Sequence, residues 1–111
     1  MVLAESAACL GEPVPIVPYQ RSGSEAFGAM VAETLGDGMA VIWGNHGAMA
    51  VGASLAQAFS VAHALEDTAR IYTLAQQLGN PVILPDDEVK ALHADWRNHY
   101  RQKAREDAST L

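Results

Sequence analysis

The sequence has one cysteine, few basic residues and no long apolar run, and each shortage excludes a class of protein. Cys9 alone can form neither a disulfide framework nor a Cys-rich zinc site, which is typical of a reducing compartment. Seven Lys and Arg against 13 Asp and Glu give a net charge of -6, so nucleic acid is not expected as the main partner. No stretch approaches the roughly 20 apolar residues of a membrane span, and the first ten residues lack a signal-peptide pattern. We therefore expect a cytoplasmic protein that binds neither membranes nor nucleic acid.

Several motifs that identify enzymes are also missing. The chain contains no G-x-x-x-x-G-K phosphate loop, no G-x-G-x-x-G after a strand, no G-x-S-x-G turn and no pair of carboxylates at acid-base spacing. Gly36-Asp37-Gly38 is interpreted as a turn that ends a helix. The residues alone therefore predict an α/β domain without a complete catalytic motif.

Hydrophobic periodicity predicts the element order strand, helix, strand, strand, helix, helix. With 111 residues, half of them apolar, the chain makes one domain at most. The predicted elements are an edge strand within Gly11–Tyr19, a helix from Ser22 to Leu35, a strand-turn-strand over Met39–Gly52, a helix from Ser54 to Leu78 and a helix from Asp86 to Ala104. Met1–Leu10 is compatible with a short helical turn or a frayed start, and the residues from Asp107 to Leu111 should fray.

Particular residues set the limits of these elements. Prolines 13, 15 and 18 confine the first strand to a sheet edge, because proline cannot donate to a ladder. Ser22 and Glu25 have capping-box spacing for the first helix. Three strands make a thin sheet with apolar edges. We therefore interpret the chain as part of a larger α/β/α layer, completed by a missing segment or by another copy.

His46 is the first candidate for chemistry. It lies between two β-prone runs, and Gly44 and Gly47 around it lack a Cβ, so that backbone, a ligand or a metal can approach closely. The alternative is that His46 is a turn histidine whose ring is hydrogen-bonded to backbone. On spacing alone, we favour this alternative over a metal ligand. No second His, Cys or carboxylate lies at paired spacing nearby, so His46 cannot hold a catalytic metal by itself.

Four other groups have ordinary structural explanations that we favour on spacing alone. His63 and Glu66 are one turn apart on a helix and could pair a base with a carboxylate, and His93 and His99 are expected to face solvent or an interface. Arg97, Arg101, Lys103 and Arg105 could attract a sugar phosphate but are explained by the negative end of a helix dipole. Tyr19 and Tyr100 could each donate a phenol proton, and neither is diagnostic.

An ordered set of motifs resembles the class II aldolase/adducin family over roughly residues 12 to 84. The motifs are Pro15-Ile16-Val17-Pro18-Tyr19, Gly23-Ser24-Glu25, Leu35-Gly36-Asp37-Gly38, Asn45-His46-Gly47, Gly52-x-Ser54-Leu55-x-x-Ala58-Phe59 and Glu66-x-x-Ala69-x-Ile71-Tyr72. The resemblance is to the C-terminal half of the family, which includes fuculose-phosphate and rhamnulose-phosphate aldolases. It implies that residues 1–111 are a single partial domain of an α/β/α sandwich with a mainly antiparallel sheet.

The resemblance also implies a role for His46, as the third ligand of a catalytic zinc or another divalent ion. Family enzymes are typically homo-oligomers with active sites between subunits, and they cleave or epimerise sugar phosphates. The family's His-x-His pair, acid-base carboxylate and phosphate loops are absent from this chain, so we expect it to be inactive alone. Tyr19 remains a weak catalytic candidate.

Two classes of function follow from the resemblance. In the first, the chain is the C-terminal portion of a metal-dependent sugar-phosphate lyase, or of a related epimerase or decarboxylase, that needs a separate N-terminal half. In the second, it is a non-catalytic association module of the adducin type, which uses the alanine-rich helix and exposed sheet edges. His46 favours the first class, and the missing ligands favour the second.

Overall fold

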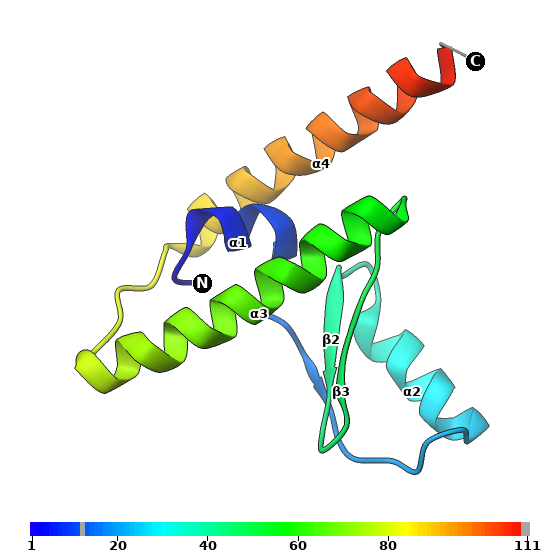
Figure 1. Ribbon diagram of the computed structural model, residues 1–111, viewed down its shortest axis with the longest axis vertical. Coiled ribbons are helices and arrows are strands. Elements are labelled where there is room, and N and C mark those ends of the chain that lie inside the picture. The colour runs from blue at the N-terminus through cyan, green and yellow to red at the C-terminus, as the bar shows by residue number, and fades with distance from the viewer. Residues whose placement is uncertain (12, 110–111) are drawn as a thin grey trace.

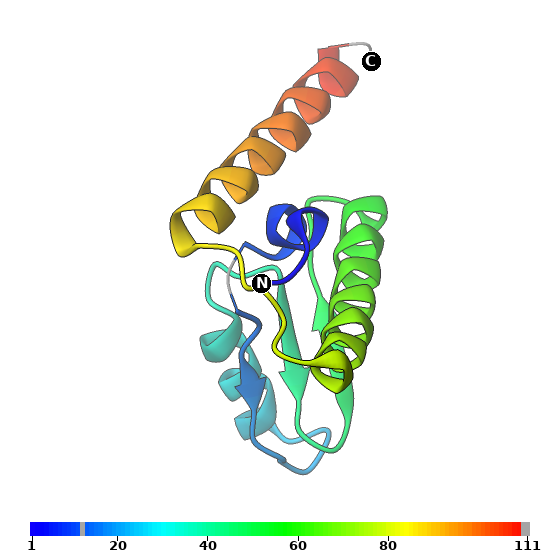
Figure 2. The same ribbon diagram turned by 90° about the vertical axis from the view of Figure 1, so that its left-hand side faces the viewer.

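The computed structural model describes residues 1–11 and 13–109, and in it a three-stranded sheet lies between helices. Helix α2 (Glu25–Leu35) covers one face of the sheet and helix α3 (Leu55–Leu78) covers the other (Figure 2). The remaining elements are α1 (Ala4–Leu10), β1 (Ile16–Val17), β2 (Ala40–Trp43), β3 (Gly47–Ala50) and α4 (Asp86–Ser109) (Figure 1). This arrangement agrees with the predicted α/β class and with helices on both faces of a sheet.

The sheet is mixed, so the expectation of a mainly antiparallel sheet is only partly right. Its order is β1-β2-β3, in which β1 pairs with β2 in parallel and β2 pairs with β3 in antiparallel fashion. The parallel pair arises because α2 connects β1 to β2 and returns the chain in the same direction, whereas a tight turn connects β2 to β3. As predicted, the proline-flanked strand β1 lies at an edge, and it has only two residues. Glu12, in the segment expected to lead into it, lies outside the described residues.

Alternation along β2 divides the core between the two faces of the sheet. Ala40 belongs to a buried cluster with Leu10 of α1 and Val61 of α3. Its neighbour Val41 belongs to a second cluster with Val17 of β1 and Val31 of α2. Because successive strand residues point to opposite faces, two adjacent small side chains are enough to anchor a helix layer on each side.

Helix α1 precedes the predicted order of elements and changes it. The sequence left two possibilities for the alanine-rich start, a short helical turn or a frayed end. In the structure it forms seven residues of helix. It buries Ser6, Ala7 and Leu10 and packs between α3 and α4 (Figure 1). Tertiary contact on both sides therefore stabilises a segment that would be marginal as an isolated helix.

Two helix ends differ from the sequence expectation. Helix α2 is capped by Ser24, whose Oγ accepts a hydrogen bond from the N–H of Phe27 at 3.1 Å, so the proposed cap at Ser22 is wrong. Helix α4 continues past Ala104 to Ser109, and residues 107–109, which were expected to fray, are helical. Residues 110–111 lie outside the described part. Helix α3 begins one residue after the predicted start Ser54, which caps it, and ends at Leu78 as expected.

The molecule is flattened, with extents of 45 × 40 × 21 Å and a radius of gyration of 15.5 Å. Helix α4 projects beyond the sheet and its covering helices (Figures 1 and 2). Among the described helices, none combines the length and apolarity that crossing a membrane requires.

Candidate functional site

The tip of the β2-β3 hairpin presents His46. Residues 44–46 connect the strands, Trp43 pairs with Gly47, and the backbone N–H of His46 donates to the carbonyl of Trp43 at 3.1 Å. Asn45 has a φ of 57°, in the left-handed region that asparagine tolerates better than most residues. The turn therefore has a defined backbone that fixes where the imidazole leaves the chain.

Gly44 makes the close backbone approach that the sequence predicts. Its N–H donates to the carbonyl of Val17 at 2.8 Å, and a Cβ placed on it would lie 3.2 Å from that oxygen and 3.2 Å from the backbone nitrogen of Tyr19. Among the described atoms, none lies within 4 Å of a Cβ at Gly47, so close backbone approach does not explain why glycine occupies that position. Gly44 thus joins the hairpin tip to the segment that carries Tyr19.

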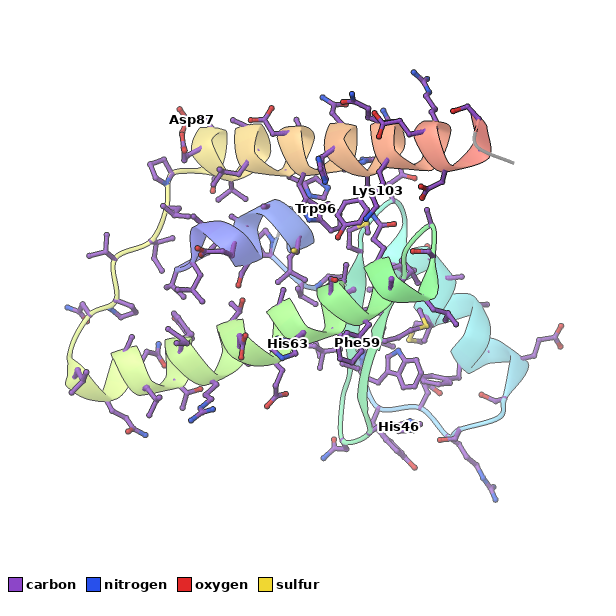
Figure 3. All side chains as sticks on the ribbon, turned by 45° about the horizontal axis from the view of Figure 1, so that its top comes forward. His46, Phe59, His63, Asp87, Trp96 and Lys103 are labelled. Carbon is purple, nitrogen blue, oxygen red and sulfur yellow. The ribbon has the colours of Figure 1, made fainter. Side chains whose placement is uncertain are left out.

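The imidazole of His46 is exposed at the hairpin tip (Figure 3). Its Nδ1 lies 3.4 Å from the hydroxyl of Ser22, and its ring stacks on Phe27 with centroids 6.1 Å apart and an angle of 18°. The ring of Trp43 approaches it edge-on at 5.0 Å. The described contacts of the ring are therefore with side chains, and the alternative of a ring bonded to backbone is not what the structure shows.

This arrangement suits one metal ligand but does not complete a metal site. When Nδ1 carries the proton and donates to Ser22, Nε2 presents its lone pair, which is the form that binds zinc. Within residues 1–11 and 13–109, no group of three or more His, Cys, Asp or Glu side chains could hold a metal ion. The donor set fits a divalent cation only if other polypeptide supplies further ligands.

The two tyrosines lie in different places. Tyr19 is 63% exposed and follows β1 beside the hairpin tip, through the approach of its backbone to Gly44. Tyr100 is half-buried on α4, where its ring packs on Trp96 with centroids 4.6 Å apart. The structure therefore brings Tyr19, and not Tyr100, to the side of the molecule that carries His46.

The other histidines have separate partners. His63 pairs with Asp67, with Nδ1 and Oδ2 3.2 Å apart, so the possible pair with Glu66, which spacing alone did not favour, is not the one that the structure shows. His93 is half-buried and its Nδ1 lies 2.8 Å from the carbonyl of Ala8, which makes it an internal contact between α4 and α1. His99 is exposed, as expected.

Cys9 is a packing residue. Its side chain is half-buried, and burial raises the pKa of the Cys9 thiol because the charged thiolate loses solvation. A raised pKa lowers the thiolate fraction at neutral pH, and the thiolate is the form that attacks electrophiles and binds metals. The burial of Cys9 therefore disfavours a role as nucleophile or ligand.

Three basic residues of α4 line a hollow, and the negative end of the helix dipole, which was expected to explain them, does not. The helix runs to Ser109, and its described last turn contains no basic residue, so the dipole, which acts within the last turn, does not account for Arg97, Arg101 or Lys103. These three side chains line a hollow of about 600 Å³ that also reaches Ser54 and Gln57 at the start of α3.

Sequence reasoning did not reveal the side chains that surround His46. It also did not reveal that Ser54 and Gln57 lie across the hollow from the basic residues of α4. Ser22 was interpreted as a helix cap, although it faces the imidazole. Phe27, three residues after the Ser24 cap, stacks on His46. No local spacing signals a contact across 24 residues, so only the fold reveals it.

Comparison with known proteins identifies relatives of the chain. Residues 1–73 match the family model described as "Class II Aldolase and Adducin N-terminal domain". The chain is 32% identical over 95 residues to 5-deoxy-D-ribulose 1-phosphate aldolase of Bacillus thuringiensis serovar kurstaki, which covers 86% of this chain and 45% of the relative. It is 32% identical over 94 residues to L-fuculose phosphate aldolase of Escherichia coli O6:H1, covering 84% and 44%.

A solved structure supports the same relationship. An L-fuculose 1-phosphate aldolase superposes with a TM-score of 0.78 at 30% identity, covering 84% of this chain and 44% of that one. The chain thus spans less than half the length of the relatives it matches. Which half of those relatives it represents stays a prediction. Because the family model covers 73 of its 111 residues, the chain belongs to the class II aldolase and adducin family.

Proposed function

We propose that this chain supplies one part of a class II sugar-phosphate aldolase, with His46 as a ligand of zinc or another divalent cation. The observation that carries the proposal is the exposed imidazole at the hairpin tip, whose Nδ1 faces the Ser22 hydroxyl and whose ring rests on Phe27. A partner at one ring nitrogen orients a ligating histidine, and the Ser22 hydroxyl can accept from Nδ1–H and so leave Nε2 free for a cation. The names of the relatives, which are aldolases of phosphorylated sugars, support the substrate class.

Two side chains of this chain have roles in the proposed chemistry. His46 would hold the cation, and the chemistry that a bound divalent cation supplies is polarisation of the substrate carbonyl and stabilisation of the negative charge that develops on it. Tyr19, beside the hairpin tip and exposed, is the candidate proton donor to the carbon that receives the electron pair when the carbon–carbon bond breaks. The same arrangement also suits epimerase or decarboxylase chemistry, which needs the same stabilised charge.

The proposal requires other polypeptide to complete the site. A catalytic zinc takes three protein ligands, and the described residues offer His46 without two companions. We propose that residues 1–111 form one partial domain, and that a second copy of the chain or an N-terminal half carrying a His-x-His pair supplies the rest. The isolated chain is then inactive. A cytoplasmic location, consistent with the single cysteine, is part of the same proposal.

The alternative of a non-catalytic association module is not favoured. The exposed apolar residues of α3 would suit association, but association is equally required of a completed enzyme. The relatives compared above are aldolases. The described hydrogen-bond contact of the His46 ring is with the Ser22 hydroxyl and not with backbone.

Metal titration tests the proposal. We expect the isolated chain to bind zinc or cobalt weakly by calorimetry, and to bind it tightly only after an N-terminal half of a class II aldolase is added, because one ligand becomes three. His46→Ala should abolish tight binding, and the cleavage of fuculose and rhamnulose 1-phosphates, in the completed protein. His99→Ala, which removes an exposed imidazole from α4, is the matched control and should leave both unchanged. Submicromolar binding by the isolated chain, or equal loss in both variants, would contradict the proposal.

A further inference from the structure

We infer that the hollow between α4 and the start of α3 is an anion site, which takes a phosphate group, either free or as a small phosphomonoester. Three cationic side chains line it, namely Arg97, Arg101 and Lys103. It lies at the end of the β2-β3 hairpin opposite His46, and Figure 3 shows Lys103 near that end and His46 at the tip. The site is therefore separate from the proposed metal ligand and goes beyond the proposed function.

No ion pair with another described residue explains the grouping of these three cations. Within the part of the chain that the structure describes, none of the three forms a salt bridge. Arg97 and Arg101 are four residues apart on one face of α4, a spacing at which like charges destabilise a helix. The helix dipole does not compensate them, because both precede the last turn. A bound anion would remove the repulsion.

The charge and lining of the hollow indicate the kind of anion. Asp107 is the one described carboxylate on its wall, which leaves a net charge of two positive, and a phosphomonoester dianion matches this. Arginine presents a planar fork of N–H donors that fits two phosphate oxygens. Tyr100 lies between the arginine side and the lysine side of the α4 face.

The opposite wall combines a polar loop with apolar side chains. Gln57 is only 6% exposed, and its Oε1 accepts the N–H of Ala53 at 2.5 Å, which holds the loop before α3 in place. Met39, Val51 and Ala56 supply apolar surface to the same hollow. With about 600 Å³ of space, the hollow has room for a phosphate with a small carbon skeleton.

Calorimetric titration of the 111-residue chain with inorganic phosphate, at low ionic strength and at a pH where phosphate is a dianion, tests the inference. We expect saturable one-site binding that weakens with added salt. Arg101→Gln and Lys103→Gln should each weaken binding about tenfold, because each removes a charge-assisted hydrogen bond. A parallel titration with phenyl phosphate identifies the source: tighter binding than inorganic phosphate indicates an organic phosphate, and equal binding indicates free phosphate.

The matched control is Arg105→Gln, which removes the same charge from the same helix without touching the hollow, and it should change binding by less than about twofold. Circular dichroism of each variant verifies that α4 is retained. His46→Ala should bind phosphate like the unaltered chain, so failure of the proposed metal role would leave this result intact. Absence of saturable phosphate binding, or equal loss with Arg105→Gln, would overturn the inference.

Discussion

At the scale of single residues, Gly44 is the most constrained position of the hairpin tip. A methyl group there would lie 3.2 Å from the carbonyl oxygen of Val17 and from the backbone nitrogen of Tyr19, and both are backbone atoms that cannot turn away. We expect Gly44→Ala to lower the free energy of unfolding by about 1–3 kcal/mol, as overpacking does. Urea unfolding followed by circular dichroism measures this.

Gly47→Ala is the control for the prediction at Gly44. No described atom lies within 4 Å of a Cβ there, so the substitution should change the free energy of unfolding by less than about 0.5 kcal/mol. Equal destabilisation in the two variants would show that loss of glycine flexibility, and not contact with the β1 segment, sets the cost.

The sequence was sufficient to locate His46 but not to describe its surroundings. Two β-prone runs around a glycine-flanked turn predicted an imidazole at a strand end, and the structure has one there. The Ser22 contact and the Phe27 stack depend on how α2 lies on the sheet, which local spacing does not encode. The basic residues of α4 were assigned to a helix end because the helix was predicted to end at Ala104, whereas it continues to Ser109.

At the scale of elements, the start of α2 shows how one cap was misplaced by two residues. Ser22 and Glu25 have the capping-box spacing, but Ser24 Oγ accepts the N–H of Phe27 and donates to the carbonyl of Arg21 at 3.0 Å. We expect Ser24→Ala to lower the free energy of unfolding by about 1 kcal/mol because it leaves an N–H of the first turn unsatisfied. Thermal unfolding monitored by circular dichroism measures the change.

Ser22→Ala provides the comparison for the cap. Its hydroxyl faces His46 and makes no described bond to the helix start, so stability should change by less than about 0.5 kcal/mol. The prediction for α2 would be wrong if Ser22→Ala cost as much stability as Ser24→Ala.

The sequence predicted the type of an element where its apolar periodicity extended over many residues. It did not predict the direction in which strands pair. The predicted helix from Ser54 to Leu78 differs from α3 by one residue at its start. The parallel pairing of β1 with β2 depends on the path of the connection through α2, and β1 has only two residues in which to display a pattern. The alanine-rich α1 has too weak a periodicity to be separated from a frayed end, and its packing against α3 and α4 decides the outcome.

At the scale of the whole molecule, the chain is less compact than is usual for its length, and it leaves large apolar side chains exposed. A compact chain of this length has a radius of gyration of about 13 Å, whereas this one has 15.5 Å. Large apolar side chains remain exposed along α3 and the segment after it, including Leu55 at 90% and Phe59 at 71%. Exposed apolar surface on this scale indicates a face that another polypeptide covers.

We therefore expect the isolated chain to self-associate through the exposed face of α3, with a mass by size exclusion and light scattering that rises with concentration. Phe59→Glu should shift the mass toward that of a monomer, because it places a charge where association would desolvate it. Gln77→Glu adds the same charge at an exposed polar position of the same helix and should leave the mass unchanged. A monodisperse monomer at high concentration would contradict the prediction. An equal shift in both variants would mean that net charge, and not the apolar face, controls association.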